Sequence, residues 1–552
     1  MKHKTPLSYD EPSKKSGSSK VSTSETLEDP LIEFDAIRPG SHSEEAGSNH
    51  WPGSDVRTFL RRVGSTSSPP KRLSKAGAIE SVMARITQAE KGRSQRQTKA
   101  PSELPKEKWI QKRGHSVTYS VLVLFTIVLY FRPYEYLALP ATLAFWIGLL
   151  LVAVYLPTQL LLAGNLTERP REVNLVLLLT LCALLSIPLA IRPNEGYQAF
   201  IDQFGKAVLI FIVTVNAVSS ERRLKGLLWL ALAVSCTLSI AALLNYRAGL
   251  LTVEGYRVGG SIGGMFSNPN EMALQLVTIL PIAIGLLLGT RGLVSKVFYG
   301  ACAALMAAGI TVTFSRGAFL GLLGAIVVLL WKIGRRHRLS AMMVVLIATA
   351  SFIAIAPGGY GQRVLSIFNS DLDPNASSTL RRQVLWRSIY VALRHPLLGV
   401  GIGNFHILSI RELVTHNAYT QVASEMGMAA LAFYTLFVIT PLRRLRQMER
   451  DTFAERNSSR FYYLAVALQA SLVAYMVSSF FASVAYQWYV YYLVAYAVVW
   501  RRLYATRAVE AKGVQEGTHA GQPDDRGQPL VDAGQAAEAF ADNVRSEARG
   551  LN

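Results

Sequence analysis

Apolar runs about as long as a lipid bilayer is thick recur along the middle of this 552-residue chain. A helix needs roughly 20 residues to cross the hydrocarbon core, and about twelve runs approach that length. They span residues 117–131, 137–160, 173–191, 206–218, 224–246, 271–289, 296–314, 317–331, 339–356, 417–441, 461–481 and 484–500. Lipid cannot hydrogen-bond to backbone N–H and C=O groups, and the runs lack the alternation of barrel strands. The sequence therefore predicts an all-α, polytopic integral membrane protein with about twelve transmembrane helices.

The charged residues set this core apart from the two ends of the chain. Of the 57 Lys/Arg and 37 Asp/Glu in the sequence, only 29 and 15 lie in residues 117–500. Because a soluble protein carries charge at about a quarter of its positions, this distribution excludes a soluble multidomain enzyme. Residues 1–116 are predicted to be a disordered basic extension and residues 501–552 a disordered tail, since neither can bury enough apolar surface to fold.

The positions of the basic residues predict how the helices are oriented. With the N-terminus inside, the short inner loops hold more than twice as many Lys/Arg as the short outer loops. Basic loops stay in the cytoplasm, so both termini are predicted to be cytoplasmic. Residues 357–416 then form one large outer loop before the tenth helix. The net charge of +20 belongs to this topology, and we expect no nucleic acid as a partner.

Several unusual polar residues fall on the predicted outer face. Arg316 stands in a short turn between two apolar runs, where an ionisable residue is costly and marks a functional-site candidate. The alternative is an arginine that merely reaches the lipid headgroups. Arg257 lies in a glycine-dense loop, followed by Asn268 and Asn270, either of which can cap the next helix. A capped helix N-terminus beside an arginine suits a phosphate, although an ordinary cap in a flexible loop is equally possible.

The large outer loop is predicted to contain an amphipathic helix, Ser377–Arg394. Its arginines include Arg381, Arg382 and Arg387. Such a helix can lie on the bilayer surface with its cations toward headgroups or a polyanionic glycan. A solvated charge stripe is the alternative.

A histidine follows at the predicted mouth of the tenth helix. Thr415 is the expected N-cap, which places His416 in the first turn. A helix N-terminus disfavours the imidazolium, and a neutral histidine is a natural general base near neutral pH. An interfacial histidine with no catalytic task is the alternative. Glu425 falls about 180° around the helix, so we do not expect it to orient His416.

The sequence shows no signature of a cofactor or metal site. It contains no Walker A motif and no zinc-ligand cluster, and the glycine run after His395 lacks the strand–helix unit of a dinucleotide fold. Asp371 and Asp373 lie in a polar turn where solvated acids are ordinary. We also find no sign of the discontinuous midplane helices that ion-coupled transporters use.

Taken in order, these motifs resemble the O-antigen ligase superfamily, which includes lipopolysaccharide O-antigen ligases, O-antigen and exopolysaccharide polymerases, and some protein O-glycosylation ligases. The resemblance spans roughly residues 170–500. The matching segments are Arg257 with 263–271 (GGMFSNPNE), 313–317 (TFSRG), 395–405 (HPLLGVGIGNF) and 415–427 (THNAYTQVASEMG).

This resemblance implies a GT-C-like, metal-independent, inverting glycosyltransferase of the bacterial inner membrane. It would move a glycan from an undecaprenyl-diphosphate-linked donor to a hydroxyl of lipid A-core, a glycan or a protein on the periplasmic face. Carried over by motif, Arg257 and Arg316 would bind the leaving diphosphate and His416 would act on the acceptor hydroxyl. Guanidinium forks match that developing charge and can stand in for a divalent metal. Further substrate-binding candidates are Arg381, Arg382, Arg387, Asn268 and Asn270.

Three functions stay open at this point. A ligase, which attaches a finished chain, and a polymerase, which joins repeat units, use the same donor chemistry and differ in the acceptor. From another class, a lipid-linked oligosaccharide flippase or polysaccharide transporter would need charges along a path open to both sides, whereas these charges gather at one face. A non-catalytic component of an envelope complex is the third possibility.

Overall fold

The structure is a computed structural model that describes residues 115–334, 377–454 and 460–520, with four isolated positions between 335 and 376. Loop positions 136, 138–139, 141, 251–252, 254 and 261–263 are excepted. Nearly all of the predicted N-terminal extension, the ninth apolar run, the first part of the large outer loop and the last residues of the tail lie outside the described residues.

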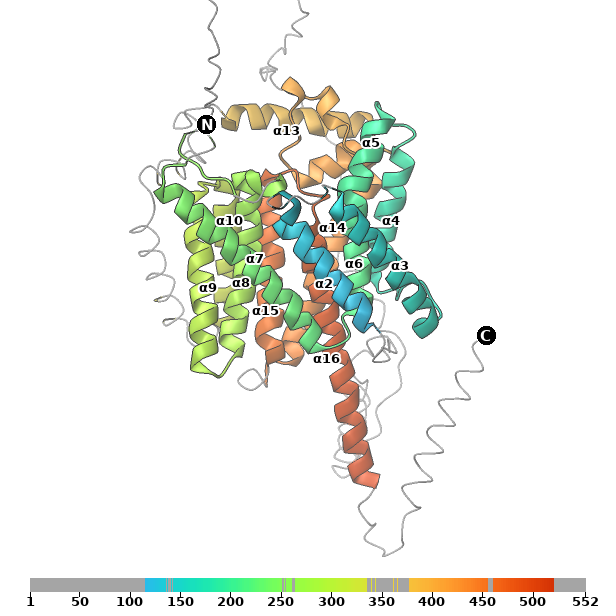
Figure 1. Cartoon of the computed structure of the whole chain (residues 1–552), viewed down its shortest axis with the longest axis vertical. Coiled ribbons are helices and arrows are strands. Elements are labelled where there is room, and N and C mark those ends of the chain that lie inside the picture. The colour runs from blue at the N-terminus through green and yellow to red at the C-terminus, as the bar shows by residue number, and fades with distance from the viewer. Residues whose placement is uncertain are drawn as a thin grey trace, which may run out of the picture. The chain divides into compact units, whose positions relative to one another are not determined.

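Helices make up the fold, and the described ranges contain no β-strand beyond one isolated bridge between Val253 and Arg257. Eleven of the predicted runs coincide with helices (Figure 1). These are α2 (Ser116–Phe131), α3 (Leu143–Ala163), α4 (Arg171–Ser186), α6 (Gly205–Ala217), α7 (Glu221–Arg247), α8 (Pro269–Gly289), α9 (Leu293–Val312), α10 (Arg316–Ile333), α14 (Ala418–Asp451), α15 (Arg460–Ser478) and α16 (Trp488–Ala520). Within the described residues, eight helical segments are long and apolar enough to cross a membrane. The protein is therefore a multi-pass helical membrane protein.

Local sequence signals explain where these helices begin and end. Asn268 caps α8 by accepting a hydrogen bond from the backbone N–H of Asn270, at 2.9 Å, and Pro269 occupies the first helical position. Such a cap satisfies a backbone donor that has no partner within the helix, and proline tolerates the first turn. Gly164 ends α3 in the left-handed region, at φ +66°, where glycine carries no steric penalty.

Several helices extend further than the sequence predicted, and one of them is α14, which ends at Asp451 rather than at residue 441. Helix α5 (Pro193–Ala199), a π-helical turn at Phe200–Phe204 and α6 form one apolar run, Pro193–Ala217, which includes residues expected in an outer loop. At the other end of the chain, α16 continues past residue 500 to Ala520. Arg502 contributes to this continuation, since its Nη1 donates to the carbonyl oxygen of Val215 at 2.8 Å. Residues 501–520, predicted to be the start of the tail, are thus helical.

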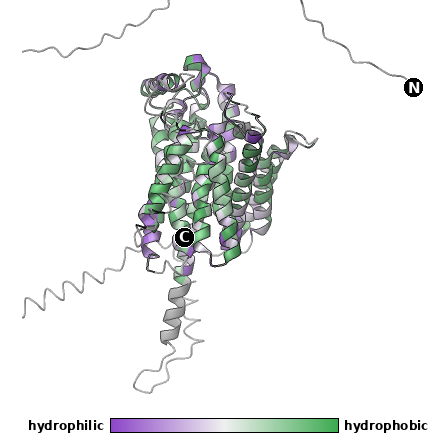
Figure 2. Cartoon of the chain, turned by 90° about the vertical axis from the view of Figure 1, so that its left-hand side faces the viewer, coloured by the Kyte–Doolittle hydropathy of each residue, from purple (hydrophilic) through white to green (hydrophobic). Residues whose placement is uncertain are grey.

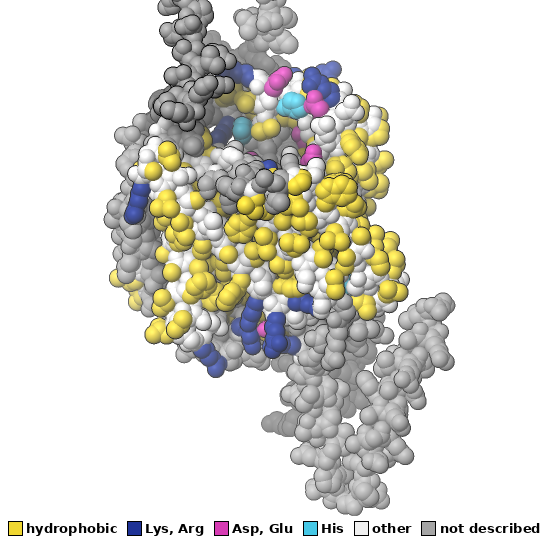
Figure 3. Space-filling view, in the orientation of Figure 1, with side chains coloured by type: hydrophobic (Ala, Val, Ile, Leu, Met, Phe, Trp, Pro, Cys, Tyr) yellow, Lys and Arg dark blue, Asp and Glu magenta, His cyan; other side chains and the backbone are white. Residues whose placement is uncertain are grey.

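Charged and apolar side chains are arranged in bands along the bundle. Hydrophobic residues dominate the middle of the helices in Figure 2, and hydrophilic residues gather at the two ends. In the space-filling view, Lys and Arg lie along the lower edge, and a second group of charged and histidine side chains surrounds a recess near the top (Figure 3). This arrangement suits a bilayer that surrounds the apolar middle.

Helix α13 (Ser377–Arg394), which has the bounds predicted from the sequence, lies across one end of the bundle (Figure 1). We call this end the α13 end. Val384 and Val391 of α13 pack against Val400 and Phe405 in a small apolar cluster separate from the main core. The segment after α13 contains two short 3-10 turns, η5 (Phe405–Leu408) and η6 (Ile410–Glu412), before α14 begins.

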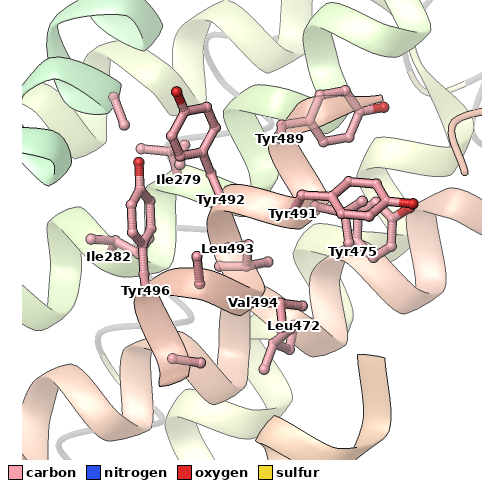
Figure 4. Packing of buried hydrophobic residues seen from close by; sticks show 14 of the residues in the cluster. Ile279, Ile282, Leu472, Tyr475, Tyr489, Tyr491, Tyr492, Leu493, Val494 and Tyr496 are labelled. Carbon is pink, nitrogen blue, oxygen red and sulfur yellow. The ribbon is translucent and has the colours of Figure 1, made fainter. Parts of the chain in front are cut away.

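The centre of the bundle is packed with tyrosines, as Figure 4 shows around α16 and α15. Buried tyrosines usually need a partner for the hydroxyl. The Tyr491 hydroxyl donates to the carbonyl oxygen of Ala485 at 3.2 Å, and the hydroxyls of Tyr434 and Tyr475 share a hydrogen bond of 2.6 Å. The helices α8 and α15 are the most deeply buried of the candidate spans and form the middle of the fold.

Candidate functional site

A pocket lies at the α13 end, where four segments that are distant in sequence meet. The segments are the first turns of α8, the turn between α9 and α10, helix α13 and the connection from α15 to α16. The space measures about 220 Å³, including the part open to solvent. Its lining residues are Asn270, Leu274, Ser315, Gly317, Ala318, Arg381, Ser478, Phe481 and Ala482.

Arg257 braces one side of this pocket from the glycine-dense loop. Its side chain is buried, with 2% of the residue exposed. The guanidinium Nε donates to the carbonyl oxygen of Thr313 at 2.9 Å, and Nη2 donates to Oδ1 of Asn270 at 2.7 Å. The structure thus separates the two asparagines: Asn268 is the exposed helix cap, and Asn270 connects Arg257 to the pocket.

The loop that carries Arg257 fits closely against the residues just before α8. A Cβ atom on Gly259 would lie 2.1 Å from the carbonyl oxygen of Ser267, and one on Gly260 would lie 2.7 Å from that of Phe266. No side chain fits at such distances, so glycine is needed here for the approach of two backbones.

Arg316 is the first residue of α10, at the edge of the pocket. Its neighbours Ser315 and Gly317 both line the space. The Ser315 hydroxyl caps the helix by accepting from the N–H of Ala318 at 3.4 Å. The preceding residue, Phe314, has a φ of +50°, so the turn between α9 and α10 is tight. This tight turn fixes the position from which the Arg316 side chain extends.

The start of α14 differs from the sequence prediction. The N-cap is Asn417, whose Oδ1 accepts from the N–H groups of Tyr419 at 2.9 Å and Thr420 at 3.0 Å. Thr415 is not the cap, because its hydroxyl donates to the carbonyl oxygen of Asn417 instead. His416 therefore precedes the helix rather than standing in its first turn. Asn417, two residues after Thr415, is the cap because its side chain accepts hydrogen bonds from two helix N–H groups at once.

His416 is held in an uncommon backbone conformation. Its φ is +52°, in the left-handed region that residues other than glycine rarely adopt. The N–H of His416 donates to the hydroxyl oxygen of Ser483 at 2.8 Å, and the same hydroxyl lies 2.9 Å from that of Thr415. Burial, with a smaller contribution from the positive charge of Arg381, lowers the pKa of His416 from 6.5 to about 4. The imidazole is thus neutral at pH 7, for reasons other than the helix N-terminus that we predicted.

The three arginines predicted on α13 have different surroundings. Arg381 lines the pocket, whereas Arg382 is exposed. Arg387 is exposed too, and its Nε donates to the carbonyl oxygen of Leu408 at 2.8 Å while its guanidinium lies over the ring of Tyr390. The structure therefore brings Arg257, Asn270, Arg316, Arg381 and His416 to one end of the bundle, and it does not bring Arg387 into the pocket.

Helix α14 is interrupted near the site, a feature that no sequence pattern predicted. Gly427 has φ +88° and ψ 176°, so two helical pieces meet there. A Cβ atom at this position would lie 2.2 Å from the carbonyl oxygen of Leu397. The backbone of Pro396 and Leu397, just before the glycine run, occupies the space beside this break. The only sequence signal was the glycine itself.

Glu425, next to this break, holds the glycine run in place. Its Oε2 accepts from the N–H of Gly403 at 2.8 Å and from the hydroxyl of Tyr486 at 2.6 Å. The backbone N–H of Gly401 also donates to the carbonyl oxygen of Glu425 at 3.0 Å. As expected, Glu425 is directed to partners other than His416. Ser483 and Tyr486, both in the connection before α16, carried no recognisable signal in the sequence.

Metal ligands do not gather at this site: in the parts of the chain that the structure describes, no three His, Cys, Asp or Glu side chains are placed to hold an ion. Asp371 and Asp373 lie outside those parts.

Fold and site together define a class: a multi-pass helical membrane protein with a pocket that Arg381 lines and a neutral histidine at the same end. Within the chain, residues 301–435 match the family model described as O-antigen ligase. The match confirms the resemblance that the motifs predicted, over about a quarter of the sequence, from α9 into α14. It includes Arg316, Arg381 and His416, whereas Arg257 precedes it. No curated protein matched the chain.

Proposed function

We propose that the protein is a membrane glycosyltransferase of the O-antigen ligase or polymerase type. It transfers a glycan from an undecaprenyl-diphosphate-linked donor to an acceptor hydroxyl on the periplasmic face of the bacterial inner membrane. The observation that carries this proposal is the convergence of Arg381 and the Arg257–Asn270 pair on one pocket, with His416 close enough to Arg381 to be affected by its charge. The match to the O-antigen ligase family model supports the reaction class.

The arginines bind the leaving group in this mechanism. As the bond between the anomeric carbon and the diphosphate oxygen breaks, negative charge develops on the diphosphate. Arg257, Arg316 and Arg381 stabilise that charge, and preorganised stabilisation of this kind is usually the largest contribution to catalysis. The hydrogen bonds from Arg257 to Thr313 and Asn270 go to neutral oxygens, so they orient the guanidinium without cancelling its charge.

His416 activates the acceptor. The neutral imidazole takes the proton of the acceptor hydroxyl, whose oxygen forms the new bond to the anomeric carbon from the side opposite the diphosphate. One such displacement inverts the anomeric centre. A pKa of about 4 makes His416 a weak base before the donor binds. Binding of the diphosphate beside Arg381 offsets the arginine's charge, so the basicity of His416 rises when the donor is in place.

A glycan profile of a strain that lacks this protein tests the proposal and separates its two forms. A ligase predicts long chains that accumulate on the undecaprenyl carrier and disappear from their acceptor. A polymerase predicts single repeat units on the carrier and the loss of long chains only. Unchanged carrier-linked and envelope-attached glycans would refute both forms.

Complementation of that strain tests the assigned residues. His416→Ala and Arg316→Ala should each abolish transfer while the protein inserts at its normal level. Arg316→Lys should remain severely impaired, because an ammonium cannot form the two parallel hydrogen bonds of a guanidinium. The matched control is Arg394→Ala, since Arg394 lies on α13 with its Nη1 bonded to the Tyr390 hydroxyl. Normal transfer by both alanine variants would refute the catalytic assignment.

A further inference from the structure

A group of polar side chains beside the pocket has buried atoms that form no hydrogen bond within the described structure. These atoms are Oε2 of Glu271, both amide atoms of Gln275, Nε1 of Trp488 and the hydroxyl of Tyr489. We call the four residues the Gln275 cluster. Gln275 is fully buried and Tyr489 is 4% exposed. Burying a polar group without a partner is costly, so a cluster of them calls for an occupant.

The members of the cluster come from two helices and face one another. Glu271 and Gln275 are one turn apart on α8 and so share a face. Trp488 and Tyr489 form the first turn of α16, and Glu271 is close enough to Tyr489 for electrostatic interaction.

An aromatic side chain from a third helix closes the cluster. Tyr130, near the end of α2, has its ring centroid 6.1 Å from that of Trp488 in an edge-to-face arrangement. The Tyr130 hydroxyl also lies close to the side chains of Gln275 and Trp488.

The cluster adjoins the pocket around α8. Asn270 and Leu274 line the pocket, and Glu271 and Gln275 each follow one residue later. One residue turns an α-helix by about 100°, so the cluster occupies the neighbouring face of the same helix end. At about 1.5 Å per residue, Gln275 lies roughly 9 Å along α8 from its first residue. Glu271 therefore lies next to the pocket residue Asn270, and Gln275 lies one turn deeper along α8.

The chemistry of the cluster fits a saccharide. A carboxylate and an amide oxygen accept hydrogen bonds, the amide and indole N–H groups donate them, and a phenol does both. Sugar hydroxyls both donate and accept, so they can satisfy all of these groups, while the rings of Tyr130 and Trp488 supply apolar walls. We infer that the Gln275 cluster is the subsite that binds the hydroxyls of the donor saccharide next to the diphosphate. This inference rests on the proposed function.

Binding measurements on the purified full-length protein in nanodiscs test the subsite. The probes are undecaprenyl diphosphate, which has no sugar, and the carrier-linked saccharide that accumulates in the deletion strain. The variants are Gln275→Leu and Tyr489→Phe, which keep the approximate shape and remove hydrogen-bonding groups. The control is Thr214→Val on α6, because the Thr214 hydroxyl is also buried without a partner and is not part of the site.

Each of the two variants should bind the carrier-linked saccharide about tenfold more weakly, the loss expected for a neutral hydrogen bond. Binding of undecaprenyl diphosphate should not change, and the apparent melting temperature of the ligand-free variants should stay equal or rise. Thr214→Val should bind both probes like the unmodified protein. Equal affinity of the unmodified protein and both variants for the saccharide, with a lowered melting temperature, would mean that ordered water fills the cluster and would overturn the inference. Failure of the unmodified protein to bind undecaprenyl diphosphate at all would instead refute the proposed function.

Discussion

Because the pKa of His416 is lowered, the acid side of the pH–rate profile tests the proposed role of this residue directly. Burial and the charge of Arg381 bring that pKa from 6.5 to about 4. At pH 5.5 a histidine with a pKa of 4 is about 97% neutral, whereas one with a pKa of 6.5 is about 9% neutral. A base with the lowered pKa thus retains about ten times more activity at pH 5.5 than an unperturbed histidine would.

The assay is the rate of glycan transfer in proteoliposomes between pH 4.5 and 8, with kcat and kcat/KM for the donor measured separately. The profile of kcat/KM reports the enzyme before the donor binds and should fall only below about pH 5. The profile of kcat reports the donor-bound enzyme, and its acid midpoint should lie higher, because the diphosphate offsets Arg381. A lowered pKa in the folded state also means that the stability linked to His416 is complete above pH 6.5 and declines as the pH falls toward 4. The folded fraction is therefore measured at each pH.

Arg381→Gln separates the two causes of the shift. The substitution should lower the overall rate and move the midpoint of kcat/KM upward, yet keep it below 6.5, because burial is the larger cause. Arg394→Gln on the same helix should leave the midpoint unchanged. A midpoint of kcat/KM at or above 6.5 in the unmodified protein, or one that Arg381→Gln does not move, would refute this account of the base.

Three further substitutions probe the supports of the site. Arg257→Lys should reduce kcat/KM about 5- to 150-fold, measured by transfer at subsaturating donor. The reason is that a buried acceptor at Thr313 or Asn270 loses its donor, at a cost of about 1–3 kcal/mol. Unchanged kinetics would contradict the proposal that these two hydrogen bonds orient the guanidinium. Ser483→Ala should lower kcat about tenfold with little change in the donor KM, since the N–H of His416 loses its acceptor, and Ser483→Thr should restore the rate. Gly427→Ala should lower the apparent melting temperature in detergent, because the new Cβ would clash with the carbonyl oxygen of Leu397 and the backbone φ at this position is +88°. An unchanged melting temperature would mean that the backbone at the break in α14 adjusts without cost.

Features that depend on composition along a single helix were predictable from the sequence. The amphipathic pattern of Ser377–Arg394 has the same bounds in the structure, and most apolar runs coincide with helices to within a few residues. The gathering of Arg257, Arg316 and His416 at one end of the bundle follows from helix count and loop charge, since both place the turns between helices on alternate sides. These signals are local, so a single sequence contains them.

Features that depend on contacts between distant segments were not predictable. The cap of α14 is Asn417 rather than Thr415, because the Thr415 hydroxyl is engaged by the carbonyl oxygen of Asn417 and by Ser483, a residue far along the chain. Nothing in the sequence pairs Ser483 with His416, or Glu425 with Gly403, because these contacts join residues far apart in the chain. Arg381 and Arg387 are the same residue type on one helix, and the sequence does not distinguish their roles. In the structure Arg381 lines the pocket, whereas Arg387 binds the carbonyl oxygen of Leu408 in the segment after α13.

The glycine run, residues 399–403, contacts α14 beside its break through backbone atoms. Gly399 approaches so closely that a Cβ there would lie 2.3 Å from the carbonyl carbon of Glu425. Val400 and Gly401 are fastened by hydrogen bonds to the carbonyl oxygens of Ser424 and Glu425. Because these contacts join backbone atoms, they fix the position of the glycine run relative to α14 whatever side chains surround them. The exposed surface of α13 can therefore change in sequence without displacing the start of α14, beside which the proposed base His416 lies.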